Sequence, residues 1–291
     1  MIPLDLSGKV AFVTGVADNV GFGWHIAKAL QAAGAEVVLG VHPRVRKIVQ
    51  NFLTRDKYAE SRALPFDVAG EFSPKAVLGC DASYDTWDDV PDEVRAQKGY
   101  TDGDVSISGS AEALKELVPG VDIIIHSMAF SPEIAKPHVE VSRSAYLTAM
   151  GVSSYSLIAL SRAMLPLMNG RQGSVIGLSY MASERVVPFY GGGMATAKAA
   201  LECDARFLSW FLGEEGHRVN IVSPGPYASR AAKSIGEIDT MIDETAQRSP
   251  LRRAIDADDV ANTTLFLCSD LAKNVTGTCL YVDAGYHAMG V

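Results

Sequence analysis

The chain of 291 residues has the composition of a compact globular protein. Hydrophobic residues make up 48% and charged residues 21% of it, which excludes disordered, collagen-like and coiled-coil chains. With 26 basic and 34 acidic residues the net charge is −8, so neither nucleic acid nor an anionic membrane is expected as a partner. The four cysteines form no CxxC pair and are expected to be small, buried apolar residues in a reducing compartment: Cys80, Cys203, Cys268 and Cys279.

No stretch resembles a membrane span or a secretory signal. The most apolar stretches, such as residues 121–125, are about as long as a strand, whereas roughly 20 apolar residues are needed to cross a bilayer. The first ten residues contain no basic segment followed by an apolar run. We therefore expect a soluble protein without a secretory signal.

Short apolar runs alternate with helical patterns from the start of the chain. Residues 9–15 form the first run, which stops at a glycine, and residues 23–33 follow with helical spacing up to Gly34. Comparable runs recur at residues 36–40, 121–126, 174–179, 218–223 and 279–283. Strands that are apolar throughout and alternate with helices indicate a parallel sheet covered on both faces. The fold class predicted is α/β: one Rossmann-like, doubly wound parallel sheet with helices on both faces, formed by a single domain of residues 1–291.

Two stretches do not follow this alternation. Residues 42–77 have a mixed pattern, and residues 83–108 are acidic and rich in turns. We expect both to be insertions at the edge of the sheet. The carboxylates of the second stretch have neither the spacing of a calcium loop nor a histidine pair nearby, so a solvated excursion is favoured over a metal site.

The turn after the first predicted strand contains Gly15, Gly21 and Gly23. Glycines allow a pyrophosphate to approach the backbone closely, and the N-terminus of the following helix favours its negative charge. The spacing is not the usual GxGxxG, and a purely structural turn is the alternative. Its place after the first strand of a parallel sheet favours dinucleotide binding.

The end of the second predicted strand lacks the acidic residue that often binds the ribose of NAD. The strand continues into Gly40-Val-His42-Pro-Arg44. His42 could contact the adenosine and Arg44 could meet a 2′-phosphate, or both could be ordinary loop residues. These residues alone leave the choice between NADH and NADPH open.

Tyr180, Tyr190 and Lys198 lie where a buried strand ends and a helix begins. A phenol can donate a hydrogen bond to a developing enolate, and a nearby ammonium can stabilise negative charge and bind ribose hydroxyls. The three glycines at 191–193 disfavour a helix. Tyr190 is therefore predicted to lie on a turn before the helix, free to move towards Lys198.

Several motifs resemble those of the enoyl-acyl-carrier-protein reductases, within the short-chain dehydrogenase/reductase superfamily, and especially the longer plastid-type branch. They cover nearly the whole chain in the family's order: Thr14-Gly-Val-Ala-Asp with Gly21-Phe-Gly-Trp24, His126-Ser-Met-Ala, Ser179-Tyr-Met-Ala-Ser-Glu-Arg, Tyr190-Gly-Gly-Gly-Met-Ala-Thr-Ala-Lys198, Ser223-Pro-Gly-Pro and Ser229-Arg-Ala-Ala-Lys. The Tyr-x-x-x-Lys motif of ordinary members of the superfamily is missing, because Met194 follows Tyr190 at the fourth place and Glu184 follows Tyr180. This departure favours enoyl reduction.

The resemblance implies a set of cofactor contacts for NADH, with NADPH the less favoured alternative. They begin at the glycine turn, pass the adenine and end at the nicotinamide: Gly15, Gly21, Phe22, His42, Asp81, Ala82, Ser127, Met128, Lys198, Tyr227, Ala228, Ser229, Arg230 and Ala231. His42 stands where the plastid-type branch tends to have a large aromatic residue, and Pro224 where alanine is usual. These departures concern cofactor preference and loop geometry.

The resemblance also implies the reaction and its residues. NADH would deliver hydride to the β-carbon of a trans-2-enoyl thioester on acyl carrier protein, giving the saturated acyl chain of fatty acid elongation. Tyr190 would be the main hydrogen-bond donor to the thioester oxygen, with Tyr180 beside it, and Lys198 would place the cofactor. Ser131 and Met194 would border the acyl substrate. No metal is needed.

The resemblance further implies a lid over the substrate and an assembly of several subunits. Residues 227–248 would form a mobile lid over the acyl chain, with Arg230 and Lys233 as part of a basic rim for the acidic carrier protein, although Glu237, Asp239 and Asp243 oppose this charge. Family members are usually homotetramers, and the apolar segment 278–291 fits burial at a subunit contact. The expected location is the bacterial cytoplasm, with a mature plastid protein as the alternative.

Two other functions are the alternatives to enoyl reduction. A short-chain reductase acting on a carbonyl or a small alcohol is disfavoured because Tyr-x-x-x-Lys is missing. A nucleotide-sensing or scaffold protein that keeps the fold without turnover would not need Tyr180 and Tyr190 together with Lys198.

Overall fold

Seven parallel strands form the centre of the molecule, in the order β3-β2-β1-β4-β5-β6-β7. The computed structural model describes residues 4–230, 232–235 and 237–290. The strands are β1 (Val10–Thr14), β2 (Glu36–Val41), β3 (Ala76–Gly79), β4 (Ile123–His126), β5 (Ser174–Leu178), β6 (Arg218–Pro224) and β7 (Cys279–Val282). The order reverses between β1 and β4, where a crevice opens at the carboxyl ends of the strands.

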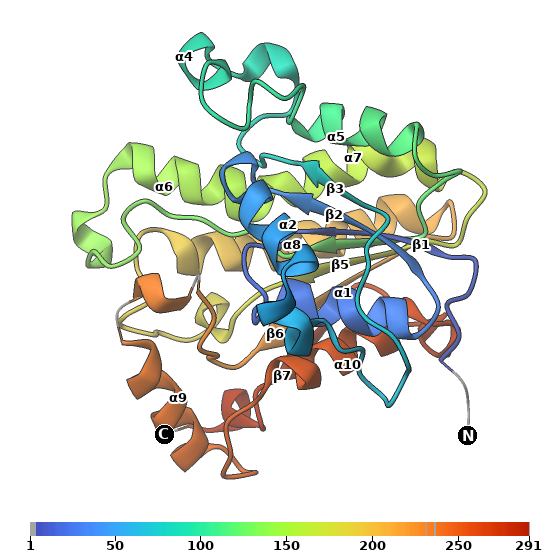
Figure 1. Cartoon of the computed structure of the whole chain (residues 1–291). Helices are drawn as coiled ribbons and strands as arrows, with labels where there is room; N and C mark the ends of the chain where they lie inside the picture. Colours follow the sequence, from blue (N-terminus) through green and yellow to red (C-terminus); the bar gives the residue numbers. More distant parts are fainter. Residues whose placement is uncertain (1–3, 231, 236, 291) are drawn as a thin grey trace.

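Helices cover both faces of the sheet. Figure 1 shows α5 and α7 on its upper side and α1 and α10 below it. The helices are α1 (Phe22–Ala32), α2 (Arg46–Thr54), α3 (Ala59–Arg62), α4 (Asp92–Arg95), α5 (Ile107–Lys115), α6 (Arg143–Met150), α7 (Ser156–Met168), α8 (Met194–Gly213), α9 (Ile238–Arg248) and α10 (Ala257–Cys268). A π-helical turn, η5 (Gly151–Tyr155), joins α6 to α7. The described residues also form short turns of 3-10 helix: η1 (Pro43–Val45), η2 (Asp56–Tyr58), η3 (Trp87–Asp89), η4 (His138–Glu140), η6 (Met181–Ser183), η7 (Ala232–Ile235), η8 (Asp270–Ala272) and η9 (Tyr286–Ala288).

The sheet separates two large hydrophobic clusters. One contains Trp24 of α1 and Leu265 of α10, and the other contains Leu114 of α5, Leu160 of α7 and Leu201 of α8. All residues of β1, β4 and β5 are buried, because side chains on both faces of these central strands meet a helix layer. The prediction of a doubly wound parallel α/β sheet is confirmed.

The main departure from the predicted elements lies in residues 42–77. This stretch contains α2, and strand β3 begins near its end and forms the edge of the sheet. Strand β3 was not predicted from the sequence, because its four residues are short for a strand and three of them are only half-buried.

Residues 83–108 rise from the carboxyl side of β3 and carry α4 at their outer end (Figure 1). Their apolar side chains form a small cluster of their own around Val90, Tyr100 and Val105. The acidic residues therefore surround a local core.

The prediction that all four cysteines are buried is wrong for Cys203, which is exposed on α8. Cys80 and Cys268 are buried and Cys279 is half-buried on the edge strand β7. In the part of the chain that the structure describes, no helix combines the length and the apolar character needed to span a bilayer.

Candidate active site

A cavity of about 160 Å³ lies at the carboxyl ends of β1, β4, β5 and β6. It brings together the glycine turn after β1, the segment after β4, the end of β5 and the start of α8. Its lining includes seven residues expected to bind the cofactor: Gly15, Gly21, Phe22, Ser127, Met128, Lys198 and Ser229. Tyr190 and Pro224 also line it, so two of the three predicted catalytic residues, Tyr190 and Lys198, share this cavity with part of the expected cofactor set.

Gly15 allows two strands to meet at the base of this cavity. Its φ is +76°, a conformation that glycine adopts without strain. A Cβ atom at this position would lie 2.1 Å from the carbonyl oxygen of Ser127. Only glycine therefore fits between β1 and the segment after β4.

Asp18 connects the glycine turn to residues 227–230. Its Oδ1 accepts hydrogen bonds from the amides of Val20 and Gly21, and its Oδ2 accepts one from the amide of Arg230 at 3.0 Å. Asp18 is buried, and Phe22 packs against Tyr227 with ring centroids 5.1 Å apart. These contacts join the glycine turn to residues 227–230, and Arg230 lies 212 residues further along the chain than Asp18.

Tyr190 lies on a turn before α8, as predicted. Its amide donates to Val187, and Gly192 and Gly193 follow with φ of +61° and +79°. Met194 then begins the helix and is buried. Ser131, expected to border the substrate, is buried and donates a hydrogen bond to the Gly192 carbonyl at 2.7 Å. Ser131 therefore fixes the turn that carries Tyr190.

The rings of Tyr180 and Tyr190 lie side by side, with centroids 4.9 Å apart. Burial raises the pKa of both phenols. A neighbouring tyrosine raises it further in each case: Tyr286 for Tyr180, and Tyr180 for Tyr190. Both groups are therefore protonated at neutral pH and can donate hydrogen bonds.

Lys198 is buried, and its ammonium donates to the Leu178 carbonyl at 2.7 Å. Burial lowers the pKa of Lys198 to about 8, while Glu202, one turn further along α8, opposes the shift. Glu202 in turn accepts a hydrogen bond from Ser179. Lys198 thus supplies a positive charge to the cavity at neutral pH.

His126 ends β4 beneath Lys198 and is fully buried. Burial and the charge of Lys198 lower the pKa of His126 to about 3, so its ring is neutral. Its Nε2 lies 2.6 Å from Ser156 Oγ, which donates to the Val152 carbonyl in the π-helical turn. Such turns occur often at functional sites, and this one holds the His126 ring through Ser156.

A second group of expected cofactor residues lies outside this cavity, beyond the ends of β2 and β3. Asp81 is buried and accepts a hydrogen bond from the Tyr100 hydroxyl at 2.5 Å, and its Oδ2 lies 3.6 Å from His42 Nε2. Ala82 is buried beside Asp81. Tyr100 belongs to the acidic stretch 83–108, which therefore helps to build this end of the site.

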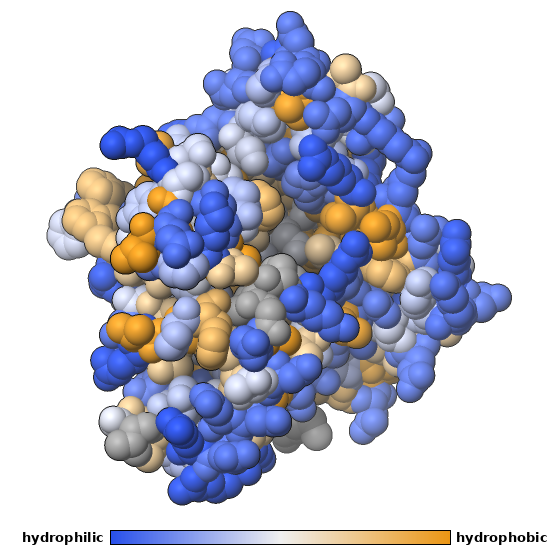
Figure 2. Space-filling view, turned by 90° about the vertical axis from the view of Figure 1, so that its left-hand side faces the viewer, coloured by the Kyte–Doolittle hydropathy of each residue, from blue (hydrophilic) through white to orange (hydrophobic). Residues whose placement is uncertain are grey.

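Apolar side chains of α9 pack onto the two tyrosines. Ile238 and Met241 are buried in a cluster with Tyr180 and Met181, and Tyr190 packs against this cluster. Ala228 and Arg230 are exposed, and Tyr227 and Ser229 are half-buried. Ala231, also expected to contact the cofactor, lies outside the described residues. Figure 2 shows that apolar side chains gather across the middle of the face that carries α6 and α9.

Within the described ranges, no group of three or more His, Cys, Asp or Glu side chains could hold a metal ion.

Known proteins resemble the chain over its whole length. The profile of the family described as Enoyl-(Acyl carrier protein) reductase matches residues 81–287. The chain is 46% identical to the chloroplastic NADH enoyl-acyl-carrier-protein reductase of Arabidopsis thaliana, covering 100% of the chain and 74% of that protein. The NADH enoyl-acyl-carrier-protein reductase of Aquifex aeolicus is 36% identical, over 98% of the chain and 94% of that protein. The solved enoyl-acyl-carrier-protein reductase of Plasmodium berghei superposes with a TM-score of 0.92 at 37% identity, covering 97% of the chain and 99% of that structure.

The chain belongs to the enoyl-acyl-carrier-protein reductase family. The predictions of an oxidoreductase of fatty acid synthesis, of enoyl reduction and of NADH as cofactor are confirmed.

Sequence reasoning missed three residues of the reductase that organise the site. Asp18 lies inside the motif Thr14-Gly-Val-Ala-Asp, but its partner Arg230 lies far along the chain. Ser156 and Tyr100 meet His126 and Asp81 through side chains alone. Only the positions of His126, the last residue of β4, and of Asp81, two residues after β3, could have pointed to partners at this edge.

Proposed function

We propose that this enzyme reduces a trans-2-enoyl thioester carried by acyl carrier protein, and that Tyr190, Tyr180 and Lys198 form its catalytic group. The observation that carries the proposal is that Tyr190 and Lys198 line one cavity together with the glycine turn after β1. Bound NADH supplies the hydride that reaches the β-carbon. The product is the saturated acyl chain.

The residues at the cavity fit a dinucleotide. The first turn of α1 contains no acidic residue and Gly21, its N-cap, offers no side-chain cap, so amides at this helix start favour a pyrophosphate. The buried ammonium of Lys198 suits ribose hydroxyls. His42, Asp81 and Ala82 would hold the adenosine, with Tyr100 fixing the carboxylate of Asp81.

Tyr190 would stabilise the enolate that forms when the β-carbon accepts hydride. A hydrogen bond from its phenol to the thioester oxygen strengthens as negative charge develops there. Because Tyr180 packs against its ring, the phenol is held in a narrow range of positions. The α-carbon then takes up a proton, which completes the saturated chain.

Lys198 would place the cofactor and supply positive charge near the enolate. Burial lowers the pKa of Lys198 only to about 8, so its ammonium is still charged at pH 7 and would stabilise the negative charge of the enolate. The apolar side of α9, formed by Ile238 and Met241 above Tyr180, would exclude water from the reacting atoms. Residues 227–248 would thus act as the lid, joined to the cofactor turn through Asp18.

The carrier protein would reach the site near residues 230–233, where Arg230 and Lys233 are exposed. We also propose a homotetramer, because α8 exposes the aromatic side chains of Phe207, Trp210 and Phe211. The enzyme would work in the bacterial cytoplasm, or in a plastid as a mature protein. The name of the Arabidopsis relative describes that protein as chloroplastic.

The reaction is tested with purified protein, crotonyl-CoA and NADH by following nicotinamide absorbance. The expected result is oxidation of NADH only when enoyl thioester is present, with no oxidation by acetoacetyl-CoA. Oxidation with the ketone alone would instead identify a carbonyl reductase. NADH binding without turnover of either crotonyl-CoA or crotonyl-acyl carrier protein would identify a nucleotide-binding protein without enzymatic activity.

A further inference from the structure

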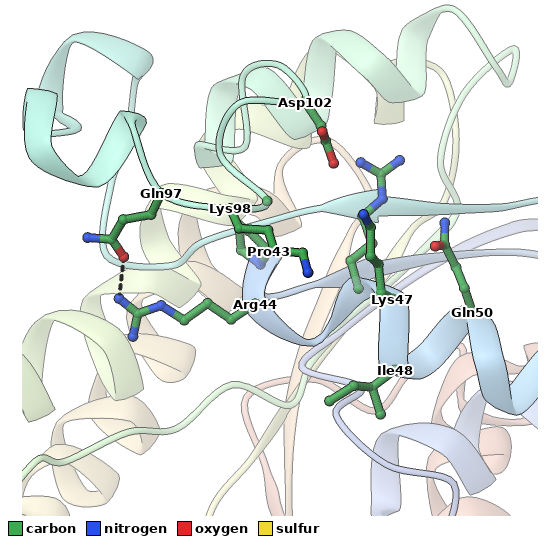
Figure 3. A pocket seen from close by; sticks show the side chains of 10 residues that line it. Pro43, Arg44, Lys47, Ile48, Gln50, Gln97, Lys98 and Asp102 are labelled. Carbon is green, nitrogen blue, oxygen red and sulfur yellow. Dashed lines mark hydrogen bonds between the residues drawn. The ribbon is translucent and has the colours of Figure 1, made fainter.

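A larger cavity, of about 670 Å³, lies beyond β2 on the adenosine side of the proposed nucleotide site. It opens between the start of α2 and residues 97–102, where Arg44 donates to Gln97 Oε1 at 2.7 Å (Figure 3). Glu202 of α8 lines neither this cavity nor the one that contains Lys198. It is nevertheless buried, with 6% of its surface exposed, so any effect of this carboxylate on the reaction has to pass through other residues.

A buried carboxylate costs free energy unless hydrogen bonds and an opposite charge compensate it. Oε1 of Glu202 accepts a hydrogen bond from Ser179 Oγ at 2.5 Å. Lys198 and Arg206 lie four residues before and after Glu202 on α8, the spacing at which side chains on a helix are neighbours. Lys198 is buried and Arg206 is exposed, so of these two cations Lys198 shares the poorly screened interior with the carboxylate.

Cys279 and Tyr281 of the edge strand β7 lie near Glu202 and are neutral at pH 7. Burial raises the pKa of the Cys279 thiol to about 12, and Glu202 and Glu184 add to this shift. Burial likewise raises the pKa of the Tyr281 phenol, with Cys279 and Glu184 adding to it, and Glu184 itself is exposed. The two groups of β7 therefore cannot balance the charge of Glu202, which leaves this to Lys198.

The titratable groups that face Lys198 from other elements are also neutral. Burial and the charge of Lys198 lower the pKa of His126 on β4 to about 3. The phenols of Tyr180 and Tyr190 are protonated, because burial raises their pKa. Burial lowers the pKa of Lys198 to about 8, and Glu202 opposes this shift. Without Glu202 the ammonium would therefore lose its proton at a lower pH.

Two hydrogen bonds join the end of β5 to consecutive turns of α8. The Lys198 ammonium donates to the Leu178 carbonyl at 2.7 Å. One turn further along α8, Glu202 accepts the bond from Ser179. Tyr180 is the next residue of the chain, so the carboxylate helps to fix the backbone that carries this phenol.

We propose that Glu202 is a positioning residue of the reductase. Its charge balances the buried ammonium of Lys198, and its bond to Ser179 fixes the strand end that carries Tyr180. The proposal rests on the roles given to Lys198 and Tyr180 in the proposed function. It assigns Glu202 no contact with cofactor or substrate.

E202Q tests the charge. Glutamine has the size of glutamate and its carbonyl can still accept from Ser179, so the variant removes the charge and keeps the bond. NADH affinity is measured by fluorescence titration between pH 6 and 9, without enoyl substrate. For the original protein it should fall above about pH 8, where Lys198 loses its charge. In E202Q this fall should begin about one pH unit lower or more, while the affinity at pH 6 changes by less than about twofold.

S179A and E202D test the bond. Both variants keep the two charges, but S179A removes the hydroxyl and the shorter side chain in E202D no longer reaches it. Loss of this hydrogen bond should lower kcat for crotonyl-CoA about fivefold in each variant, with the pH dependence of NADH affinity unchanged. E214Q, which removes an exposed carboxylate just after α8, is the matched control and should change neither quantity.

The pH dependence separates positioning from simple structural support. A fall in NADH affinity that stays at its original pH in E202Q, or an equal loss of affinity at every pH, would overturn the proposal. So would an unchanged kcat in both S179A and E202D, and this result decides if circular dichroism shows that E202Q does not fold. Turnover of crotonyl-CoA with NADH by the original protein is measured separately. Its absence would overturn the proposed function, whereas NADH binding tests the charge of Glu202 without any turnover.

Discussion

Lys198 and Tyr190 line the same cavity but are expected to act on different partners. Lys198→Ala should lose cofactor binding and turnover together, because the buried ammonium would no longer contact the nicotinamide ribose. Tyr190→Phe should keep NADH affinity and lose roughly 10²–10³-fold in kcat, as is usual when a donor to a developing oxyanion is removed. Fluorescence titration of NADH and steady-state kinetics check both variants. Weak NADH binding by Tyr190→Phe would refute this division of roles.

The lowered pKa of Lys198 also predicts how stability depends on pH. Between about 8, the pKa in the folded protein, and 10.5, its ordinary value, the unfolded chain binds more protons at this residue than the native one. Below pH 8 the folded protein bears the whole free-energy cost of burying this charge. The cost falls as the pH rises to 10.5, so the contribution of Lys198 to the free energy of unfolding becomes more favourable across this window. Lys198→Met has no such cost.

Urea unfolding of the protein without nucleotide, at several pH values between 8 and 10.5, tests this. The stability difference between Lys198→Met and the original protein should shift steadily in favour of the original protein as pH rises. Lys273→Met, at an exposed position, controls for the loss of a lysine. A difference that stays constant with pH would show that the pKa of Lys198 is not lowered in the folded protein.

At the scale of elements, α9, part of the proposed lid, is expected to bind the acyl chain and not the nucleotide. Met241 is buried against the cluster of Tyr180 and Met181, so Met241→Ala should raise KM for crotonyl-CoA about tenfold through lost apolar contact. NADH affinity should stay unchanged. Steady-state kinetics with Glu244→Gln, an exposed position on the same helix, gives the control. A tenfold loss of NADH affinity in Met241→Ala would place α9 over the cofactor instead.

Elements with strong local patterns could be predicted from the sequence, and those defined by partners could not. Strand β4 reads as an uninterrupted apolar run because both its faces are buried, and the turn at Tyr190 follows from three consecutive glycines. The edge strand β3 lacks this pattern, since its side chains are half-buried. The residues of the cofactor cavity followed from a family resemblance, whereas the bond from Asp18 to Arg230 depends on contacts across 212 residues.

At the scale of the whole molecule, α8 has two sides with different surroundings. Lys198, Leu201 and Ala205 face inwards and are buried, whereas Phe207, Trp210 and Phe211 are 64%, 72% and 65% exposed. A contiguous exposed aromatic surface is typical of a protein interface. The exposed Cys203 lies four residues before Phe207 and so on the same side of the helix. Burial in an assembly would restore the environment that the sequence predicted for this cysteine.

This surface predicts the effect of a single charge on assembly. Trp210→Glu places a carboxylate at the centre of the aromatic face, and because α8 runs back to Lys198, loss of the assembly should also weaken catalysis. Sedimentation velocity should show a homotetramer for the original protein and smaller species for the variant. Glu214→Gln, exposed one turn further along the chain, should leave the tetramer intact. A tetramer that persists in Trp210→Glu would move the interface elsewhere, and the half-exposed edge strand β7 with the segment after it would then be the next surface to test.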